Sequence, residues 1–450
     1  MYKRQVDERG CFTEEVPEFR GQFVFDADPL IIEKLRKVGA LLFADTVEHA
    51  YPHCWRCKSP VIFRATHQWF ISIEHRGLRQ KLLEWINRVR WIPQWGRDRI
   101  YNMVATRPDW CISRQRAWGI PIVAFYCQGC QEVLLDRRII EHVASIVEKE
   151  GADVWFLWPE EQLLPPGTKC PKCGGESFRK EEDILDVWFD SGIAFYASLG
   201  YPLRKDKFEE LWPVDFIMEG HDQIAGWFFS LLRTGFLGFN RVPYNTVLMH
   251  GFALDEKGRE MHKSLGNYIT HQEVLARRRG GRDVLRWYLL RNTVWEDLRF
   301  SWRSLEQVFD DLNIVWNVYL FASTYMNLDK FNPSRYKLED YIHLLRPEDK
   351  WLISRVEELT EKVTDALENY LVHIAARMLR DFIVEDVSHW YIRLIRRRVW
   401  IEKEDPEKIT AYVTLYYVLK KFLVLAAPII PFIVEKIYQE VFRISPEMPE

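Results

Sequence analysis

The spacing of apolar residues changes along the chain and becomes helical after about residue 304. In the last third, apolar side chains recur at steps of three and four, at Trp351, Leu352, Val356, Leu359 and Val363. This spacing places them on one face of a helix. The pattern predicts helices at about 305–326, 351–371, 374–400 and 408–442, with breaks at Pro428 and Pro431. We therefore expect an α-helical bundle in this part of the chain.

Before this bundle, the pattern follows the order strand, helix, strand. Two short apolar runs, at 214–218 and 246–254, flank a helix-like stretch at 225–236. This order is typical of a parallel βαβ unit, so we expect an α/β fold here. Two further elements are expected nearer the start, a strand at 120–126 and a helix at 29–38 with Asp28 as its N-cap.

Composition narrows the classes of protein that fit. The chain has 450 residues, of which 48% are hydrophobic and 28% charged, so it is long enough for several globular units. Because the formal net charge is only -3, a nucleic-acid partner would meet local basic clusters and not a basic surface. We find no signal peptide and no apolar run of about 18 residues, so we expect a cytoplasmic location and no membrane partner.

Six of the eight cysteines form three Cys-x-x-Cys pairs. The pairs are Cys54 with Cys57, Cys127 with Cys130, and Cys170 with Cys173. The second and third pairs predict a four-thiolate zinc site, which would fold an insertion too small for its own core. The alternative is a set of packed thiols without metal. The first pair has no obvious second pair and is either half of a metal site or a reduced pair.

Polar residues follow the first apolar run of the βαβ unit, namely Glu219, Asp222 and Gln223. In open α/β sheets, ligands bind at the carboxyl ends of the strands. These side chains are therefore placed for a small polar ligand, such as an ammonium group or ribose hydroxyls. The alternative is that they cap the following helix.

The segment Glu260-Met-His-Lys-Ser-Leu-Gly-Asn267 follows the second apolar run. Lys263 brings an ammonium group near a strand end, which suits charge on a transferring phosphate. By itself, a Lys-Ser-Leu-Gly-Asn sequence is more often a surface turn than an ATP site. Its place one strand after Glu219 favours the ATP site.

Several motifs, taken in order, resemble the second half of the catalytic domain in isoleucyl-tRNA synthetases, a class I family. They are Asp186-Val-Trp-Phe-Asp-Ser-Gly192, Glu219-Gly-x-Asp-Gln-x-x-Gly-Trp-Phe228, His250-Gly-Phe252 and His262-Lys-Ser-Leu-Gly-Asn267. Within the branched-chain group, two further motifs look like the isoleucine members. These are Cys54-Trp-Arg-Cys57 and Ser113-Arg-Gln-Arg-Ala-Trp-Gly-Ile-Pro-Ile122.

The resemblance implies activation of isoleucine by ATP with Mg²⁺, followed by transfer to isoleucine tRNA. It implies that Lys263 and Ser264 are catalytic and that Trp188 and Trp227 wall the isoleucine pocket. The implied adenylate-binding residues are Glu219, Gly220, Asp222, Gln223, His250 and Gly251. In the helical part, which resembles an anticodon-binding domain, the implied tRNA contacts are Arg393, Arg396, Arg397 and Arg398. For any one of these arginines, a solvated helix face is the alternative.

The chain departs from the family pattern at two places. The usual loop reads Lys-Met-Ser-Lys-Ser, but here Glu260 and His262 replace the first Lys and the first Ser. The family's His-Ile-Gly-His motif is missing, which implies a carboxy-terminal part, either a fragment from a truncated gene or one subunit of a split enzyme whose amino-terminal half is a second polypeptide. We expect the isolated chain to be inactive and unable to proofread. Cys54 and Cys57 would then be a half-site for zinc, completed by that partner.

The implied fold is an incomplete Rossmann-like parallel sheet with a zinc-ribbon insertion, followed by an all-α anticodon-binding bundle. The implied segments are an editing-insertion tail (1–40), a catalytic and connective part (41–126), a zinc-knuckle insertion (127–180), the second catalytic half (181–255), the ATP loop with the stem-contact region (256–330) and the anticodon-binding domain (331–450). Two alternatives stay open: a non-catalytic tRNA-binding paralogue, which Glu260 and His262 favour, and a fragment of a valine or leucine ligase.

Overall fold

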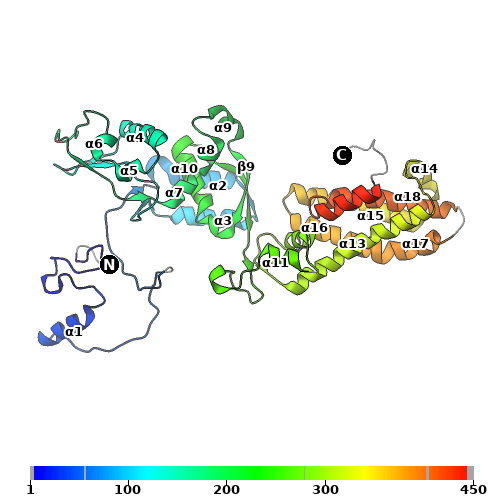
Figure 1. Ribbon diagram of the computed structural model, residues 1–450, viewed down its shortest axis with the longest axis horizontal. Coiled ribbons are helices and arrows are strands. Elements are labelled where there is room, and N and C mark those ends of the chain that lie inside the picture. Colours follow the sequence, from blue (N-terminus) through cyan, green and yellow to red (C-terminus); the bar gives the residue numbers. More distant parts are fainter. Residues whose placement is uncertain (1–4, 55–56, 278, 402–404, 443–450) are drawn as a thin grey trace. The chain divides into compact units, whose positions relative to one another are not determined.

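The computed structural model describes residues 5–54, 57–277, 279–401 and 405–442 (Figure 1). It divides the chain into two compact units. Unit 1 comprises 1–74 and 108–190, and unit 2 comprises 75–107 and 191–450. One short helix, α7 (Val187–Gly192), crosses the boundary between them.

Among its described residues, unit 1 contains short strands and short to medium α-helices. The helices are α1 (Asp28–Lys37), α4 (Arg137–Glu150), α5 (Val154–Leu157) and α6 (Glu160–Leu163). The strands are β1 (Phe70–Ile71), β3 (Trp110–Cys111), β4 (Ser113–Arg114), β5 (Phe125–Cys127), β6 (Val133–Leu134), β7 (Phe178–Lys180) and β8 (Ile184–Leu185). They form antiparallel pairs β1–β3 and β4–β8 and a sheet in the order β6-β5-β7.

The three-stranded sheet of unit 1 has a small hydrophobic core behind it. Phe125, Trp155 and Phe178 are buried there with the apolar face of α4. The rings of Phe125 and Trp155 lie 5.2 Å apart in an edge arrangement. Asp136 caps α4 by accepting a hydrogen bond from the backbone of Arg138. This core places the cysteine pairs on a fixed support.

Two elements expected in this unit differ from the structure. The helix α1 begins at Asp28 itself and its N-cap is Ala27, so Asp28 is not the cap. The strand expected at 120–126 is reduced to β5, because Pro121 has no N–H to donate and makes only an isolated bridge to Ile184.

Unit 2 contains a parallel sheet, a pair of short strands and the helical bundle. Its strands are β2 (Arg90–Ile92), β9 (Val214–Gly220), β10 (Tyr244–His250), β11 (Ala253–Leu254) and β12 (Leu298–Arg299). The helices near the strands are α2 (Leu78–Arg88), α3 (Trp95–Thr106), α8 (Ala194–Leu199), α9 (Lys205–Leu211), α10 (Trp227–Phe239), α11 (His271–Ala276) and α12 (Arg282–Leu290).

The predicted parallel βαβ unit is confirmed. β9, α10 and β10 follow one another, and β10 pairs in parallel with β9 on one side and β2 on the other. The helix α10 packs against α2, and α2 packs against α3, beside the strands (Figure 1). Within the described ranges, β9 is an edge strand of this sheet. Its open edge lies next to the candidate site.

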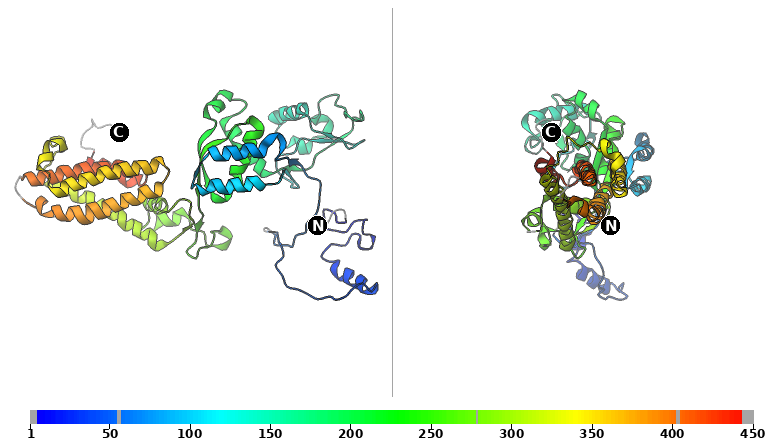
Figure 2. Two further views of the ribbon diagram at one scale, coloured as in Figure 1. Left: turned by 180° about the vertical axis from the view of Figure 1, so that it is seen from behind. Right: turned by 90° about the vertical axis from the view of Figure 1, so that its right-hand side faces the viewer.

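The expected helical bundle is also confirmed, and its helices run alongside one another in Figure 2. They are α13 (Trp302–Leu328), α14 (Leu338–Tyr341), α15 (Pro347–Glu368), α16 (Val372–Asp381), α17 (Ile392–Val399), α18 (Pro406–Ala426) and α19 (Pro431–Ile437). A π-helical segment, Phe382–Tyr391, joins α16 to α17. The expected break is confirmed, with Pro428 between α18 and α19 and Pro431 as the first residue of α19.

One helix corrects the expectation that the chain has no apolar run of membrane-spanning length. Among the described residues, α18 has a window with a mean hydropathy of 1.4 and passes that test by length and composition. Most of this window, 61%, is buried inside the bundle, where α18 packs against α15, α17 and α13. Its apolar character follows from its central place in the bundle core, because a helix enclosed by neighbours buries most of its sides.

Candidate active site

The candidate site lies where β9 and β10 end together. Their parallel register pairs Met249 with Glu219 and His250 with Gly220. This brings His250 Nε2 to 3.9 Å from Glu219 Oε2, with both side chains partly open to solvent. His250 Nδ1 lies 2.8 Å from the carbonyl oxygen of Gly251, which only accepts hydrogen bonds, so Nδ1 carries a hydrogen. The other ring nitrogen of His250, Nε2, faces the Glu219 carboxylate.

Two glycines allow the polar groups at these strand ends to approach the backbone closely. A Cβ at Gly220 would clash with Asp222 Oδ1, and one at Gly251 would clash with the backbone of Glu296. Neither clash can be relieved without moving backbone or a site carboxylate. The sequence places glycine where the chain has no space for a side chain.

Gln223 has the capping role that was the alternative for this group. Its Oε1 accepts a hydrogen bond of 3.0 Å from the backbone of Trp227, the first residue of α10. Its Nε2 donates to Asp222 Oδ2 at 2.9 Å. Gln223 thus holds the Asp222 carboxylate against the start of α10, while Glu219 stands apart from this contact.

Asp297 belongs to the same neighbourhood, although the sequence does not reveal it. Its Oδ1 accepts a 2.7 Å hydrogen bond from the backbone of Phe252 and lies 3.5 Å from His221 Nε2. The His221 and Phe252 rings meet edge to face at 4.9 Å. Asp297 is 76 residues from His221. No local pattern connects such distant positions, so only the fold shows the contact.

The two tryptophans expected to form a pocket lie in different units. Trp227, at the start of α10 in unit 2, donates from Nε1 to the Ser191 carbonyl oxygen at 3.0 Å. Trp188 lies in α7 on the unit 1 side, is 38% exposed, and donates from its backbone to Asp186 Oδ1 at 3.3 Å. Their shared pocket stays a prediction.

The loop 260–267 follows a hairpin that begins at β11. Lys263 and Ser264 are exposed and lie in a one-turn 3₁₀ helix, Lys263–Leu265. Lys263 Nζ is 6.0 Å from the centre of the Tyr268 ring. Glu260 and His262, which stand where the family has Lys and Ser, contact each other, with His262 Nε2 3.2 Å from Glu260 Oε2. A cavity of about 520 Å³, lined in part by Lys263, Tyr268 and His271, adjoins the turn.

The buried carboxylate of Asp255 anchors this loop. It accepts hydrogen bonds from the backbone of Lys257 and Arg259, from the Arg259 side chain, and from Asn267 Nδ2 at 2.9 Å. These bonds, that from Asn267 foremost, hold the pKa of Asp255 well below its usual range. Asp255 therefore stays ionised throughout the neutral range.

The cysteines Cys127, Cys130, Cys170 and Cys173 come together, with all four Sγ atoms within 4.8 Å of one another. The Sγ atoms of Cys127 and Cys173 are 3.5 Å apart, and those of Cys130 and Cys170 are also 3.5 Å apart. A tetrahedral zinc with Zn–S bonds of about 2.3 Å separates its sulfurs by about 3.8 Å. The arrangement therefore fits a four-thiolate metal site and is too wide for disulfides.

The pair Cys54 and Cys57 stands apart from this cluster. Among the described residues, no third ligand groups with it. Cys57 is exposed, and hydrogen bonds from Ser59, first from its backbone, lower the pKa of the Cys57 thiol to about 7. A thiol with this pKa is about half thiolate at neutral pH, and the thiolate is the form that binds metal. Trp55 and Arg56 of this motif lie outside the described residues.

Of the four arginines expected to contact tRNA, three are exposed on α17. Arg393, Arg396 and Arg397 point away from the core, close along the helix to the exposed ring of Trp390. Arg398 corrects the expectation, because it is only 4% exposed and donates to both carboxylate oxygens of Asp349. It lies on the buried face with Ile395 and Val399 and serves the bundle core.

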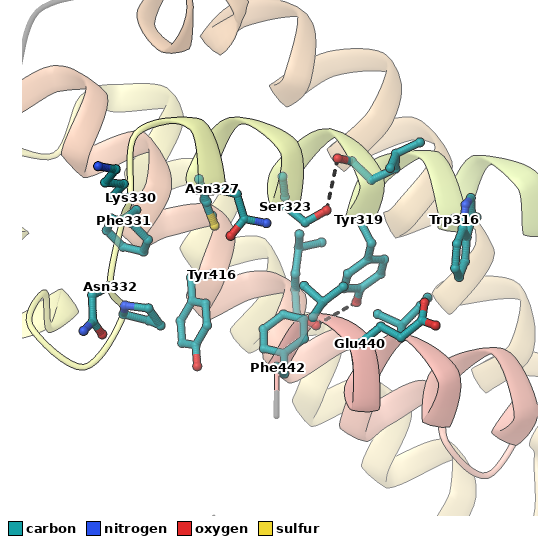
Figure 3. Close-up of a pocket in the computed structure, with 17 residues that line it drawn as sticks. Trp316, Tyr319, Ser323, Asn327, Lys330, Phe331, Asn332, Tyr416, Glu440 and Phe442 are labelled. Atoms are coloured by element: carbon teal, nitrogen blue, oxygen red, sulfur yellow. Dashed lines mark hydrogen bonds between the residues drawn. The ribbon is translucent and has the colours of Figure 1, made fainter. Parts of the chain in front are cut away.

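A cavity of about 510 Å³ inside the bundle has a different character (Figure 3). Its charged lining residues, Lys330 and Glu440, lie at opposite ends of it (Figure 3). The hydroxyls of Tyr319 and Ser323 already donate to the backbone carbonyls of Leu419 and Leu320. The grouped carboxylates and histidine found at the strand ends have no counterpart in this lining.

Comparison with known proteins decides the family. The family described as tRNA synthetases class I (I, L, M and V) matches residues 7–301, more than half of the chain. The chain belongs to this family. In this class I synthetase chain, residues 349–449 match a second family, the anticodon-binding domain of tRNA ligase. The matched ranges include the strand ends and loop of the candidate site and the α17 arginines.

Curated relatives of this class I synthetase chain are isoleucine–tRNA ligases. That of Saccharolobus islandicus is 48% identical over 444 residues, covering 98% of this chain and 41% of the relative. That of Methanopyrus kandleri is 47% identical, covering 97% of this chain and 41% of the relative. The chain therefore spans about two fifths of the length of the relatives it matches, and the resemblance to isoleucine members is confirmed.

Solved structures agree on the fold. A crystal structure of Mycobacterium tuberculosis methionyl-tRNA synthetase bound by methionyl-adenylate aligns with a TM-score of 0.59. It covers 86% of this chain and 65% of that chain at 20% identity. At this identity the likeness shows a shared class I fold alone. The roles of individual side chains in this synthetase chain stay predictions.

Proposed function

We propose that the chain is part of an isoleucine–tRNA ligase, which joins isoleucine to ATP as an adenylate and transfers it to isoleucine tRNA. The observation that carries this proposal is the match to isoleucine–tRNA ligases over 98% of the chain. The chain spans 41% of their length, and in our proposal a second polypeptide supplies the rest of the site. We place the enzyme in the cytoplasm, where its tRNA substrate is used.

In the proposed site, Glu219 and Asp222 bind the polar groups of the adenylate at the ends of β9 and β10. The backbone at these strand ends is shaped by Gly220 and Gly251. The two carboxylates are held by Gln223 and His250. Lys263 acts on the phosphate charge of ATP with its Mg²⁺, and Ser264 supplies a donor beside it. For the isoleucine side chain, Trp227 is the proposed wall within unit 2, in an apolar pocket that discriminates by shape.

The open edge of β9 is the proposed docking site for the second polypeptide. Parallel strands are normally covered on both faces and paired at their edges. On β9, Phe216 is 37% exposed and Met218 is 50% exposed. A strand from the missing part would pair with the edge of β9 and extend a Rossmann-like sheet, and segments packed on the face of that sheet would cover these side chains. Two exposed apolar residues on a strand whose edge is unpaired among the described residues support this assignment.

The α17 face is the proposed tRNA-binding surface. Arg393, Arg396 and Arg397 offer three guanidinium groups for phosphates, and the half-exposed ring of Trp390 offers a stacking surface for a base. Trp390 is braced by Trp351, whose ring centre is 4.1 Å away. Arginines beside a braced aromatic ring are typical of single-stranded RNA recognition.

Zinc in the four-cysteine cluster would be structural, holding the β6-β5-β7 region together as a zinc ribbon. Cys54 and Cys57 would bind a second zinc together with two ligands from the missing part. Metal analysis separates these cases. One zinc per isolated chain, rising to two in the assembled enzyme, is expected; one in both states contradicts the shared site.

The test of the proposed activity is isoleucine-dependent exchange between ATP and pyrophosphate. We expect exchange when the chain is mixed with the amino-terminal part of a related ligase and none with either part alone. Exchange that depends on valine or leucine would change the substrate. Glu260 and His262, which stand where the family has Lys and Ser, favour one rival, a non-catalytic tRNA-binding paralogue. Salt-sensitive tRNA binding by the mixture, without exchange, would establish that rival.

A further inference from the structure

We propose that Asn267 is a positioning residue that fastens the Lys263 loop to the buried carboxylate of Asp255. This inference rests on the proposed role of Lys263. The Asn267 side chain makes three hydrogen bonds, one to Asp255 outside the loop and two to the loop backbone. Nδ2 donates to Asp255 Oδ2 at 2.9 Å and to the Glu260 carbonyl oxygen at 3.0 Å. Oδ1 accepts from the backbone of His262 at 3.0 Å.

The anchor of this contact is fixed in the fold. Asp255 is 6% exposed and directly follows β11, which pairs in parallel with β12. The hairpin after it is closed by Arg259, whose Nε donates to Asp255 Oδ2 at 3.0 Å and whose carbonyl accepts from the Asp255 backbone at 2.8 Å. A carboxylate held by several donors has little freedom to follow a moving loop.

The segment between Asp255 and Asn267 is short and mostly exposed. It includes the turn Lys263–Leu265 and then Gly266, whose φ of 65° lies in the left-handed region that glycine adopts readily. This conformation turns the chain back, so that Asn267 returns beside Glu260. The hydrogen bond from Asn267 to the Glu260 carbonyl oxygen then closes the segment 260–267 into a loop, and Lys263 is part of that loop.

Apart from the exposed contact between His262 and Glu260, little else in the described structure holds this turn. Two backbone hydrogen bonds lie within it, from Leu265 to His262 at 3.0 Å and from Gly266 to Lys263 at 3.2 Å. Isolated single turns of this kind are marginal in water. The contact of Lys263 with the Tyr268 ring, at 6.0 Å, is at the limit of a useful cation–π distance. The Asn267 contact is therefore the main constraint on where Lys263 stands.

This positioning matters because the ammonium group must meet a phosphate whose charge develops only in the transition state. Displacement of a catalytic group by about 1 Å costs on the order of 100-fold in rate. We expect Asn267→Ala to lower kcat for isoleucine-dependent exchange at least about 10-fold, while KM for isoleucine and the Tm of the chain stay unchanged. In a Lys263→Ala background the same substitution should add less than about 2-fold, because Asn267 acts through Lys263.

The experiment has a second part that does not need catalysis. Hydrogen exchange of the isolated chain, read by mass spectrometry, reports the loop amides of His262, Leu265 and Gly266. We expect Asn267→Ala to speed their exchange at least about 10-fold. Asn267→Asp keeps the shape but sets a carboxylate against Asp255 and the Glu260 carbonyl, so it should speed exchange as much. Lys257→Gln, which alters an exposed side chain of the same hairpin, is the matched control and should change neither measurement.

The outcomes separate the two proposals. The positioning role is overturned if Asn267→Asp behaves like the unsubstituted chain, if the control loses as much as Asn267→Ala, or if the losses from Lys263→Ala and Asn267→Ala multiply. If the unsubstituted mixture shows no exchange of pyrophosphate, the proposed function fails. In that case, hydrogen exchange of the loop amides alone tests the positioning role of Asn267. Unchanged protection of these amides in Asn267→Ala would overturn that role.

Discussion

Removing the Arg398 guanidinium should destabilise the bundle far more than removing its neighbour Arg397. Arg398 donates to Asp349 Oδ1 and Oδ2 at 2.9 and 2.8 Å, to Glu348 at 3.0 Å and to Thr410 at 2.8 Å. Asp349 is fully buried. Without Arg398, the Asp349 carboxylate would keep two hydrogen-bond partners among the described residues, the Tyr391 hydroxyl at 2.6 Å and the Arg346 backbone at 3.0 Å.

The magnitude follows from this geometry. Breaking a buried ion pair by removing one partner costs about 3–5 kcal/mol, because the remaining charge stays buried. We therefore expect Arg398→Ala to lower the opening free energy of α17 and α18 by about that amount. A surface substitution such as Arg397→Ala should change it by about 0.5 kcal/mol or less. Replacing the pair together, as Arg398→Met with Asp349→Leu, should restore much of the loss.

Hydrogen exchange of the full chain measures these differences helix by helix, which suits a molecule with two units that need not unfold together. The reasoning would be refuted if Arg398→Ala cost less than about 1 kcal/mol, or no more than Arg397→Ala. Equal stability of the single and the double replacement would also contradict it, since the account attributes the loss to an unpaired Asp349.

Three further outcomes are expected. Cys170→Ser should abolish zinc retention and loosen β5 and β7, measured by metal content and amide exchange, while retained metal with unchanged protection contradicts the site. Arg396→Ala with Arg397→Ala should reduce the slope of log affinity for tRNA against log salt by about 1 to 2, whereas an unchanged slope removes these residues from the interface. The depressed pKa of Asp255 means that its stabilising bonds are complete above the ordinary aspartate pKa and disappear only as pH falls through the lowered folded value. The amides of Lys257 and Arg259 should therefore stay protected at pH 4, and loss of protection there would contradict the contact.

The arrangement of strands and helices could be predicted where local periodicity decides it. The βαβ unit and the bundle breaks at Pro428 and Pro431 were of this kind, because apolar spacing and proline act within one element. The strand at 120–126 was predicted too long, since the apolar pattern outweighed the missing N–H of Pro121. The rule that proline cannot donate a hydrogen bond within a sheet was available from the sequence and would have shortened the predicted strand.

The site could be predicted less completely. Motif order pointed to Glu219 and Lys263, but it did not reveal Asp297, which bonds to Phe252, or Asp255, which bonds to Asn267. Arg398 could have been separated from Arg397 by helical spacing, because Arg398 follows buried Ile395 by three residues. The remaining contacts depend on tertiary structure, which brings residues of unrelated sequence position together.

The central claim is that Lys263 acts in an adenylate site that this chain forms with a second polypeptide. Isoleucine-dependent exchange between ATP and pyrophosphate, measured with the chain, the complementary part and their mixture, tests it most directly. The account predicts exchange in the mixture alone and its loss, by at least about 100-fold, in a mixture containing Lys263→Ala. A mixture that binds isoleucine tRNA but shows no exchange, or exchange that survives Lys263→Ala, would contradict it.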